Sequence, residues 1–470
     1  MNALNRTWDK LISQKIKETK DSGSRWRPAF HIAPPVGWLN DPNGLCQYKG
    51  IYHAFYQYSP FDEKGGLKFW AHCTSRDMLH WKLEGVPLVP DQPYDCHGVY
   101  SGSAVIEDEH MYLYYTGNVK EAGAYDYINQ GRQANTVRAV SYDGIHFERK
   151  ELLLTNGDYP MDLTCHVRDP KVWKEGGRYY MVQGARTKED KGVVLVFSSE
   201  DKYHWNYIHR LESEEKFGFM WECPDLYELD GQTILCISPQ GVEQDGYWYA
   251  NKYQTVTSVI HGDFRTDGVP EGFRELDGGF DFYAPQTFLT EDGRRILIGW
   301  MGMADVEDEY TNRTTEDGWQ NVLTLARELS LKDGIVCQNP VRELSSWWNE
   351  EVSFEGQYTG NTDICYELNL KNTEKKWEVL IAGGLKLSWS PEEYVFRMEF
   401  TDGKLGCGRG LRAREIKACK DIRIVVDASC VEVFMNGGKD VFSTRFYPEK
   451  DQYTVKASGE GLTGSYRYRV

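Results

Sequence analysis

The chain lacks long apolar runs and any excess of positive charge. No stretch approaches the roughly 20 apolar residues that span a bilayer, which excludes a membrane helix. With 54 Lys and Arg against 71 Asp and Glu, the formal net charge is −17. This charge opposes binding to a polyanion, and no basic run with interleaved aromatic residues could overcome it. We therefore expect neither nucleic acid nor a membrane as partner.

Cysteine is present but not in paired patterns. The 11 cysteines include no Cys-x-x-Cys pair, and their odd number favours reduced thiols over a disulfide framework or a zinc site. Residues 1–20 carry several lysines among acids and no apolar core segment, so we expect a short amphipathic helix and not a signal peptide. Together these features favour the cytoplasm.

Several catalytic signatures are also missing. The sequence contains no Gly-x-Ser-x-Gly, no phosphate-binding loop and no dinucleotide fingerprint, which removes the usual signs of acyl, phosphoryl and hydride transfer. His31, His53, His72, His97 and His166 show no His-x-x-x-His or His-Glu pairing. We interpret them as structural histidines and expect no metal and no cofactor.

Aromatic residues, in contrast, are abundant, with 15 Trp and 30 Tyr. Flat aromatic rings stack well on the C–H faces of sugars, so the excess is consistent with sugar binding. Packing of aromatic residues in strands explains the excess about equally well.

What the chain does contain is one layout repeated five times, at intervals of about sixty residues. Each unit opens on a short motif and continues, past a turn, into a run rich in aromatic or branched residues. The openings are Asp41-Pro42, Ser101-Gly102-Ser103, Asp169-Pro170, Glu222-Cys223-Pro224 and Ala284-Pro285-Gln286. The runs are 51–58, 111–117, 179–184, 233–240 and 295–302. Five such units predict the five blades of a β-propeller.

A second repeated motif supports this period. The segment Ser75–Trp81 recurs as Ser141–Phe147 and as Ser199–Trp205.

We therefore predict an all-β chain in three parts: a lead-in over residues 1–30, a five-bladed propeller over 31–343 and a β-sandwich over 344–470. The sandwich is indicated by short alternating segments at 366–370, 377–381, 394–400, 422–426 and 431–436. The connection carries Trp347-Trp348, which favours a packed interface between the domains over a loose tether.

Three of the five openings place an acid in the same slot: Asp41, Asp169 and Glu222. If each opening lies on the innermost strand of its blade, the three acids meet in one axial funnel. Glycoside hydrolysis needs two carboxyl groups that flank the scissile bond, and a third anion can grip sugar hydroxyls. Any one of these acids alone is more often a turn former, so the prediction depends on their matched positions.

The neighbours of each acid suggest its role. Glu222 has apolar neighbours, which favour a proton donor, whereas Asp41 lies in an amide-rich turn that favours an ionised nucleophile. Arg168 directly precedes Asp169, and we expect its cation to keep that carboxyl anionic.

These motifs resemble the three signature motifs of the β-fructosidases of glycoside hydrolase family 32. They are Trp38–Gly44, Arg168-Asp169-Pro170 and Glu222-Cys223-Pro224. The resemblance implies a propeller with an appended sandwich and retention of anomeric configuration. It also implies that Asp41 is the nucleophile, Glu222 the general acid and base, and Asp169 the transition-state stabiliser.

The resemblance further implies a set of substrate-binding residues: Asn40, Gln57, Trp70, Tyr100, Ser101, Arg168 and Trp300. It is nearest to the bacterial sucrose-6-phosphate hydrolases and invertases of the family. The substrate expected is therefore a small sugar, sucrose 6-phosphate or sucrose. Short fructo-oligosaccharides, fructosyl transfer and a noncatalytic sugar-binding propeller remain alternatives.

A phosphorylated substrate would need cations near the pocket. The candidates are Lys68, Arg132, Arg186 and Lys252, each of which is more often a solvated surface charge than a ligand. The sequence leaves the oligomeric state open.

Overall fold

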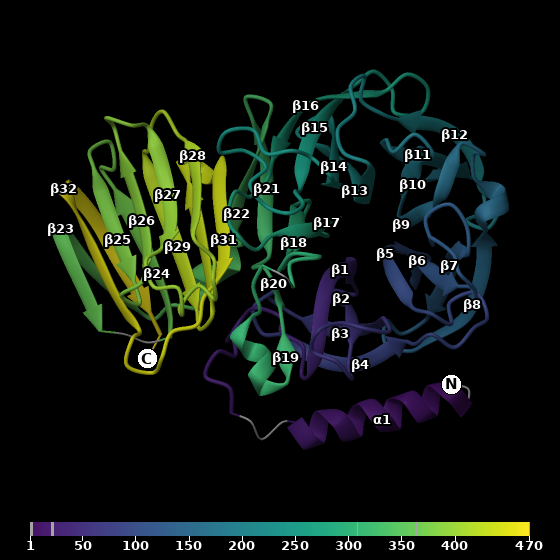
Figure 1. The fold of residues 1–470 in the computed structure, drawn as a ribbon, viewed down its shortest axis with the longest axis horizontal. Helices are drawn as coiled ribbons and strands as arrows, with labels where there is room; N and C mark the ends of the chain where they lie inside the picture. The colour runs from purple at the N-terminus through teal and green to yellow at the C-terminus, as the bar shows by residue number, and fades with distance from the viewer. Residues whose placement is uncertain (1–2, 20–22, 308, 362–363, 470) are drawn as a thin grey trace.

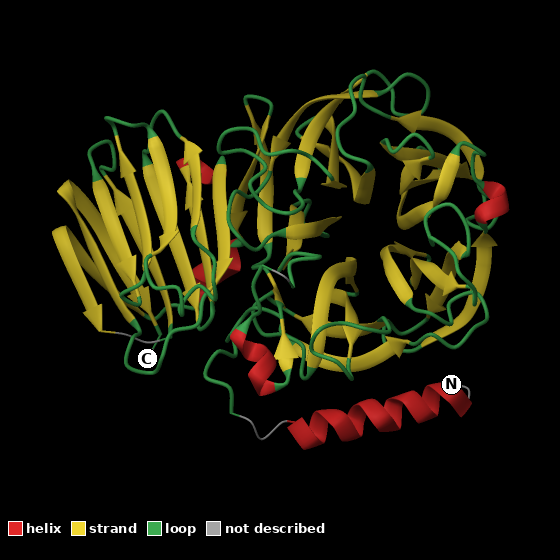
Figure 2. Cartoon of the chain, in the orientation of Figure 1, coloured by secondary structure: helices red, strands yellow, loops and turns green. Residues whose placement is uncertain are grey.

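The computed structural model describes residues 3–19, 23–307, 309–361 and 364–469. Figure 1 shows two bodies side by side, a ring of sheets around a central axis and a second, strand-rich domain against one side of the ring. Strands dominate both bodies (Figure 2). The predicted all-β class, five-bladed propeller and C-terminal sandwich are confirmed.

Four-stranded antiparallel sheets form the blades, and the predicted runs are the second strands. Blades one and two comprise β1 (Gly37–Tyr48), β2 (Ile51–Ser59), β3 (Phe69–Ser75), β4 (Lys82–Leu88), β5 (Val99–Glu107), β6 (His110–Lys120), β7 (Arg132–Ser141) and β8 (Phe147–Leu154). Blades three and four comprise β9 (Leu163–Glu175), β10 (Arg178–Thr187), β11 (Gly192–Ser199), β12 (Asn206–Leu211), β13 (Met220–Leu229), β14 (Gln232–Gln240), β15 (Val256–His261) and β16 (Val269–Glu275). Blade five comprises β17 (Tyr283–Leu289), β18 (Arg295–Met301), β21 (Arg327–Lys332) and β22 (Ile335–Pro340), with β20 (Val322–Leu323) beside β18.

The ring is closed by a short parallel pairing. β19 (Trp319–Gln320), which belongs to the long excursion of blade five, pairs in parallel with the start of β1. Asn321 adds a side-chain hydrogen bond, donating Nδ2 to the carbonyl of Leu39 at 3.0 Å. The segment that leads into the acid Asp41 is therefore held by residues almost three hundred positions later in the chain.

The repeated seven-residue motif is a turn that joins two strands of a blade. In each copy an aspartate accepts hydrogen bonds from the hydroxyl of the serine two residues before it and from backbone N–H groups after it. The histidine Nδ1 lies 2.7 Å from the other carboxylate oxygen in all three copies, at His80, His146 and His204. The motif therefore marks blade architecture and not a site.

The second domain is one continuous sheet folded into two layers. Its strands are β23 (Glu350–Asn361), β24 (Cys365–Lys371), β25 (Trp377–Ile381), β26 (Leu385–Ser390), β27 (Val395–Phe400), β28 (Leu411–Glu415), β29 (Asp421–Asp427), β30 (Cys430–Met435), β31 (Asp440–Arg445) and β32 (Thr454–Tyr468). The first half of β32 pairs with β25 and its second half with β24. The long strand thus joins both layers, and an apolar core fills the space between them.

The boundary between the domains is short and packed. The last propeller strand ends at Pro340 and β23 begins at Glu350, with a 3₁₀ turn over Arg342–Ser346 between them. Phe30 contacts Trp347 and Trp348 edge-on, with ring centroids 5.2 and 6.1 Å apart. The predicted packed interface is confirmed, while the division at 343 and 344 stays a proposal. In the described ranges, further 3₁₀ turns cover Asn156–Asp158, Arg313–Asp317 and Asn436–Gly438.

Charged side chains that are completely buried join the two domains. His31 Nδ1 lies 2.8 Å from Asp427 Oδ2, and its Nε2 lies 2.8 Å from Glu432 Oε1. Arg327 donates to Glu432 Oε2 from Nε at 2.8 Å and from Nη2 at 2.5 Å, and reaches Asp277 Oδ2 at 3.1 Å. Because the exposed fraction of all five side chains is 0%, the charges depend on one another and not on water.

The predicted amphipathic helix is present as α1 (Ala3–Thr19), the only α-helix among the described residues; Met1, Asn2 and Lys20 of the predicted segment lie outside them. It lies along the outer edge of blade one with Ile12 buried (Figure 1). Within the described ranges, no helix has the length and apolar character to cross a bilayer.

The buried histidine makes the stability of the fold depend on pH. Burial lowers the pKa of His31, but hydrogen bonds to Asp427 and Glu432 outweigh burial and raise this pKa to about 8. Because the unfolded value is about 6.5, this stabilisation is complete below about pH 6.5 and is lost as the pH rises through about 8. We expect the stability advantage of wild type over His31→Gln to shrink by on the order of 2 kcal/mol between about pH 6 and about pH 9.

Denaturant unfolding at a series of pH values measures this difference. The matched control is Leu411→Gln, which alters a side chain of the sandwich that does not titrate and is 45% exposed, and which should leave the slope of stability against pH unchanged. A constant difference between wild type and His31→Gln across this range would contradict the prediction.

Candidate active site

The five openings lie on the five innermost strands, where each strand interrupts its pairing with the second strand. The register shifts fall between Leu39 and Pro42 on β1, Tyr100 and Gly102 on β5, Arg168 and Lys171 on β9, Glu222 and Asp225 on β13, and Tyr283 and Gln286 on β17. Proline cannot donate to the ladder, and a β-bulge re-aims the side chains beside it. The acids are therefore displayed at the same level of the ring by breaks in the ladder, as the repeat predicts.

Asp41 is held by amide and hydroxyl donors. Ser101 Oγ donates to Asp41 Oδ2 at 2.6 Å, and Gln57 Nε2 donates to the same oxygen at 3.3 Å. Asn40 Nδ2 donates to Asp41 Oδ1 at 3.2 Å and to Gln57 Oε1 at 3.0 Å. Trp38 in turn fixes Asn40 through an indole hydrogen bond of 3.0 Å. This shell orients the carboxylate toward the cavity.

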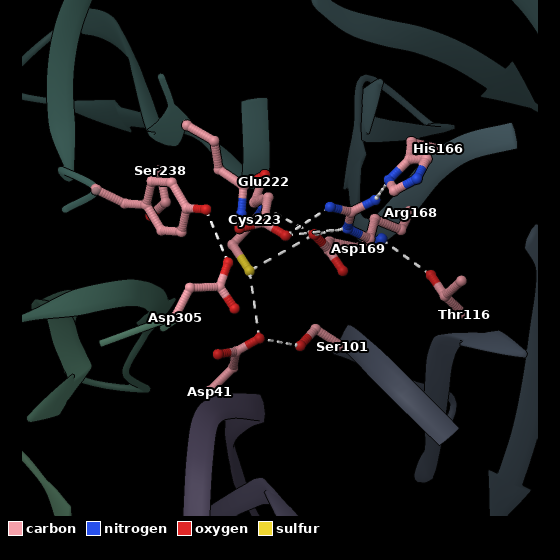
Figure 3. A network of polar contacts seen from close by, with 12 residues as sticks. Asp41, Ser101, Thr116, His166, Arg168, Asp169, Glu222, Cys223, Ser238 and Asp305 are labelled. Carbon is pink, nitrogen blue, oxygen red and sulfur yellow. Dashed lines mark hydrogen bonds and ion pairs between the residues drawn. The ribbon is translucent and has the colours of Figure 1, made fainter. Parts of the chain in front are cut away.

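Asp169 lies on a bulge with φ of 65° and is buried. The backbone N–H of Cys223 donates to Asp169 Oδ2 at 2.9 Å. The Cys223 thiol lies between two of the acids, with Sγ 3.6 Å from Asp169 Oδ2 and 3.7 Å from Asp41 Oδ2 (Figure 3). The bulge on β13 therefore links the acids of blades one and three.

Glu222 has a polar environment, contrary to the expectation from its apolar neighbours in sequence. Arg168 donates to Glu222 Oε1 from Nε at 3.1 Å and from Nη2 at 2.6 Å. Gln240 Nε2 and Tyr283 Oη donate to Glu222 Oε2 at 2.9 and 2.6 Å. The apolar sequence neighbours do not surround the carboxyl group, because Trp221 is buried within the propeller and Met220 is completely enclosed.

Arg168 corrects a second expectation. Its guanidinium is directed at Glu222, and its Nε lies 3.9 Å from Asp169 Oδ2, beyond hydrogen-bond reach. Nη1 donates to His166 Nδ1 at 2.7 Å, which ties the arginine to the rim. Adjacent residues on a bulged strand need not pair, and here the cation serves the next blade.

The acids border one open cavity of about 410 Å³. Of the predicted residues, Asn40, Asp41, Gln57, Tyr100, Arg168, Asp169, Glu222 and Trp300 line it. Ser101 reaches the cavity through its hydrogen bond to Asp41. The predicted roles of these residues stay predictions.

Trp70 was predicted to bind substrate directly, but the structure places it outside the cavity. Its side chain has an exposed fraction of 0% and is absent from the cavity lining among the described residues. It packs against Phe55 and Tyr115 and donates Nε1 to the carbonyl of Tyr100 at 3.1 Å. The tryptophan therefore supports the backbone of a lining residue from behind.

Sequence reasoning missed three residues of the Glu222 environment. Gln240 is the last residue of the predicted run 233–240, and Gln57 is the last but one of the run 51–58. Tyr283 directly precedes the opening of blade five, and the sequence indicated only a structural role for His166. A glutamine close to the end of both runs is the sequence signal that could have identified Gln240.

Burial dominates the electrostatics of the two aspartates. Desolvation raises the pKa of Asp169 to about 7, against the lowering influence of Arg168 and with a further increase from the charge of Glu222. Desolvation and the Glu222 charge also raise the pKa of Asp41, and the hydrogen bond from Ser101 opposes them. The free site therefore retains a proton more readily than three exposed carboxyl groups would.

The raised pKa of Asp169 predicts a stability cost. An exposed aspartate has a pKa near 3.9, so the folded state binds the Asp169 proton more tightly and loses stability as the pH rises from about 4 to about 7. We expect Asp169→Asn to be more stable than wild type by about 1 to 3 kcal/mol above about pH 7. This advantage should disappear toward about pH 4. Thermal unfolding at both pH values measures it, and an Asp169→Asn protein that is less stable than wild type at the higher pH would refute the argument.

Comparison with known proteins agrees with this geometry. The chain matches the glycosyl hydrolases family 32 N-terminal domain over residues 31–340 and the family 32 C-terminal domain over 405–467. It is 38% identical over 462 residues to a sucrose-6-phosphate hydrolase of Bacillus subtilis (strain 168), covering 95% of this chain and 94% of that protein. It is also 38% identical over 450 residues to a raffinose invertase of Escherichia coli, covering 91% of each. A solved β-fructofuranosidase of Bombyx mori superposes with a TM-score of 0.87 at 34% identity, covering 99% of this chain and 98% of that one. The chain belongs to glycoside hydrolase family 32.

Proposed function

We propose that this protein is a retaining β-fructofuranosidase that cleaves sucrose 6-phosphate or sucrose. One observation carries the proposal: carboxyl groups from three blades, Asp41, Asp169 and Glu222, converge on one open cavity. The relatives named sucrose-6-phosphate hydrolase and raffinose invertase support the same substrate class. A small sugar is thus the proposed partner, and we place the reaction in the cytoplasm.

Retention of configuration results from two successive displacements at the anomeric carbon of the fructosyl unit. The Asp41 carboxylate attacks the anomeric carbon of the fructosyl unit while Glu222 donates its proton to the departing glycosidic oxygen. Glu222 then removes a proton from water, whose oxygen attacks the same carbon and releases Asp41. Asp169 would bind fructosyl hydroxyls and stabilise the positive charge that develops on the sugar ring.

Which of the three carboxyl groups holds the catalytic proton depends on the charges of the other two. The free site holds a proton readily, because burial raises the pKa of Asp169 and of Asp41. Sugar hydroxyls that donate to Asp169 would favour its ionised form and shift the proton toward Glu222. Arg168 contacts Glu222 in the free site, so proton donation requires this ion pair to loosen when substrate is bound.

Replacing Asp41 tests the covalent mechanism. We expect Asp41→Asn to lose at least about a thousandfold in kcat on sucrose, because an amide cannot form the fructosyl ester. Initial rates on sucrose, sucrose 6-phosphate, 1-kestose and inulin, with NMR detection of the first fructose anomer, test both substrate class and stereochemistry. Asp108→Asn, which makes the same change at an exposed turn residue outside the described cavity lining, is the control and should keep wild-type turnover. Near-normal turnover in Asp41→Asn, or inverted fructose as first product, would overturn the assignment.

The four candidate cations for a phosphate differ in their surroundings. Lys68 and Arg132 line the cavity, whereas Arg186 pairs with Asp190 at 2.6 Å, and Lys252 is not among the described lining residues. Within the described part of the chain, neither Lys68 nor Arg132 forms an ion pair with a carboxylate. In a protein with a net charge of −17, two such cations at one cavity favour an anionic group on the substrate.

Of these two cations, Arg132 is the better phosphate ligand. Its Nη1 lies 3.4 Å from His166 Nε2, and His166 contacts the arginine that holds Glu222, the proposed acid. Lys68 instead lies on the side of Asp41, over the ring of Trp38 at 5.3 Å. Since the leaving glucosyl unit occupies the side of the acid, we propose that its 6-phosphate is bound by Arg132.

Substitution of Arg132 separates the two candidate substrates. Arg132→Gln should raise KM for sucrose 6-phosphate about tenfold or more, since it removes a charge-assisted contact, and leave KM for sucrose within about twofold. Lys252→Gln removes the same charge outside the cavity and should change neither value. Equal effects of Arg132→Gln on both sugars would leave plain sucrose as the better substrate.

A further inference from the structure

Helix α1 packs against the propeller through an aromatic cluster beside a loop that lines the cavity. The indole of Trp8 lies edge-on to Phe69, with ring centroids 5.3 Å apart, and 5.9 Å from the ring of Phe61. Phe61 and Phe69 also meet each other edge-on at 6.3 Å. The three rings form a closed cluster, defined here as the Trp8 cluster, at the two ends of the 60–68 loop.

The 60–68 loop connects β2 to β3 and forms part of the cavity wall. Lys64, Gly65, Gly66 and Lys68 line the cavity. Gly65 and Gly66 have φ of 102° and 144°, a region that glycine adopts readily and other residues rarely do. The loop therefore has little conformational preference of its own between its aromatic ends.

Few polar contacts restrain the loop between these ends. Asp62 accepts the backbone N–H of Lys64 at 2.8 Å, and the carbonyl of Lys68 accepts the N–H of Val99 at 2.9 Å. The first contact is local to the loop, and the second fixes only its last residue. The first half of the loop is thus anchored by the ring of Phe61, which contacts Trp8 of the helix and Phe69 at the start of β3.

The opposite end of α1 reaches a second element that leads to the site. A Cβ atom at Gly318 would lie 3.0 Å from Cγ2 of Thr19, so the helix end touches the turn just before β19. Ile12 and Ile16 pack in the same apolar cluster as Phe69 and Trp38. The propeller ring is closed by β19 on β1. The helix therefore contacts the loop that lines the cavity through Trp8 and the turn before the ring-closing strand through Thr19.

We propose that Trp8 is a positioning residue for substrate binding, which holds the 60–68 loop so that Lys64 and Lys68 face the bound sugar. The kinetic test of this role for Trp8 rests on the proposed fructosidase function. Trp8 does not touch the cavity, so its effect is on the position of the loop and hence on KM. The reacting groups on β1, β9 and β13 keep their own supports and kcat is largely preserved.

The kinetic test compares Trp8→Ala with two matched variants. Trp8→Ala should raise KM for sucrose about three- to tenfold with kcat within about twofold of wild type. Trp8→Phe, which retains a ring between Phe61 and Phe69, should restore most of the KM. Leu11→Ala alters a side chain of the same helix that is 43% exposed and should have no effect. Unchanged KM in Trp8→Ala with α1 intact by circular dichroism would overturn the proposal.

Two further measurements separate positioning from general destabilisation. If Trp8 acts through the loop, Trp8→Ala should raise KM much less in a Lys68→Ala background than in wild type, whereas independent effects multiply. Hydrogen exchange of the peptide covering residues 60–68 should accelerate in Trp8→Ala while exchange of β13 stays unchanged. Multiplicative effects, or unaltered exchange of the loop, would refute the proposal. Exchange needs no substrate, so failure of the wild-type protein on every fructoside would refute the proposed function without deciding this test.

Discussion

The site depends on a break in hydrogen bonding that recurs at the same level of every inner strand. A regular antiparallel strand alternates its side chains between two faces and cannot turn a carboxyl group toward the ring axis at will. A bulge releases the strand from this alternation, and proline stabilises the break because it has no N–H to leave unpaired. The carboxyls of Asp41, Asp169 and Glu222 can converge because blades one, three and four all interrupt their ladders in this way.

The repeated inner-strand break also explains which strands and site residues could be predicted from the sequence. The runs at 51–58 and 233–240 predicted second strands that the structure places at Ile51–Ser59 and Gln232–Gln240, because aromatic and branched residues on a buried blade leave a strong local signal. The acids followed from their shared slot beside proline. The helix α1 was likewise visible from its amphipathic pattern.

What sequence reasoning missed lies across blades. Arg168 stands next to Asp169 in the chain, but its guanidinium contacts Glu222, and only the placement of neighbouring blades determines this pairing. The pKa of Asp169 rises because of burial, which the adjacent arginine in the sequence does not reveal. In the sandwich, β32 was not predicted, because Gly459, Gly461 and Gly464 interrupt its alternation of apolar and polar residues. The family resemblance implied that Trp70 binds substrate, but its side chain is buried behind Tyr100.

The interface between the domains is fixed by buried charges and not by broken strand pairing. Five fully buried charged side chains, including His31 and Arg327, link residues that are far apart in the chain. Apolar surfaces tolerate sliding, whereas each buried charge demands its own partner at hydrogen-bond distance. The network therefore fixes the sandwich in one orientation against blade five, and the end of the lead-in is fixed with it because the N–H groups of Ala29 and Phe30 donate to Asp427.

The parallel pairing of β19 with β1 also has a consequence for synthesis of the protein on the ribosome. All three acids have been translated once Glu222 is added, but the strand that holds the β1 segment before Asp41 begins only at Trp319, 97 residues later. At roughly 5 to 20 residues per second, translation of that stretch takes about 5 to 20 s. During this interval the growing chain exposes the unpaired start of β1 and the aromatic faces of unfinished blades. A chain that ends before residue 319 therefore carries all three acids but lacks the strand that pairs with the start of β1.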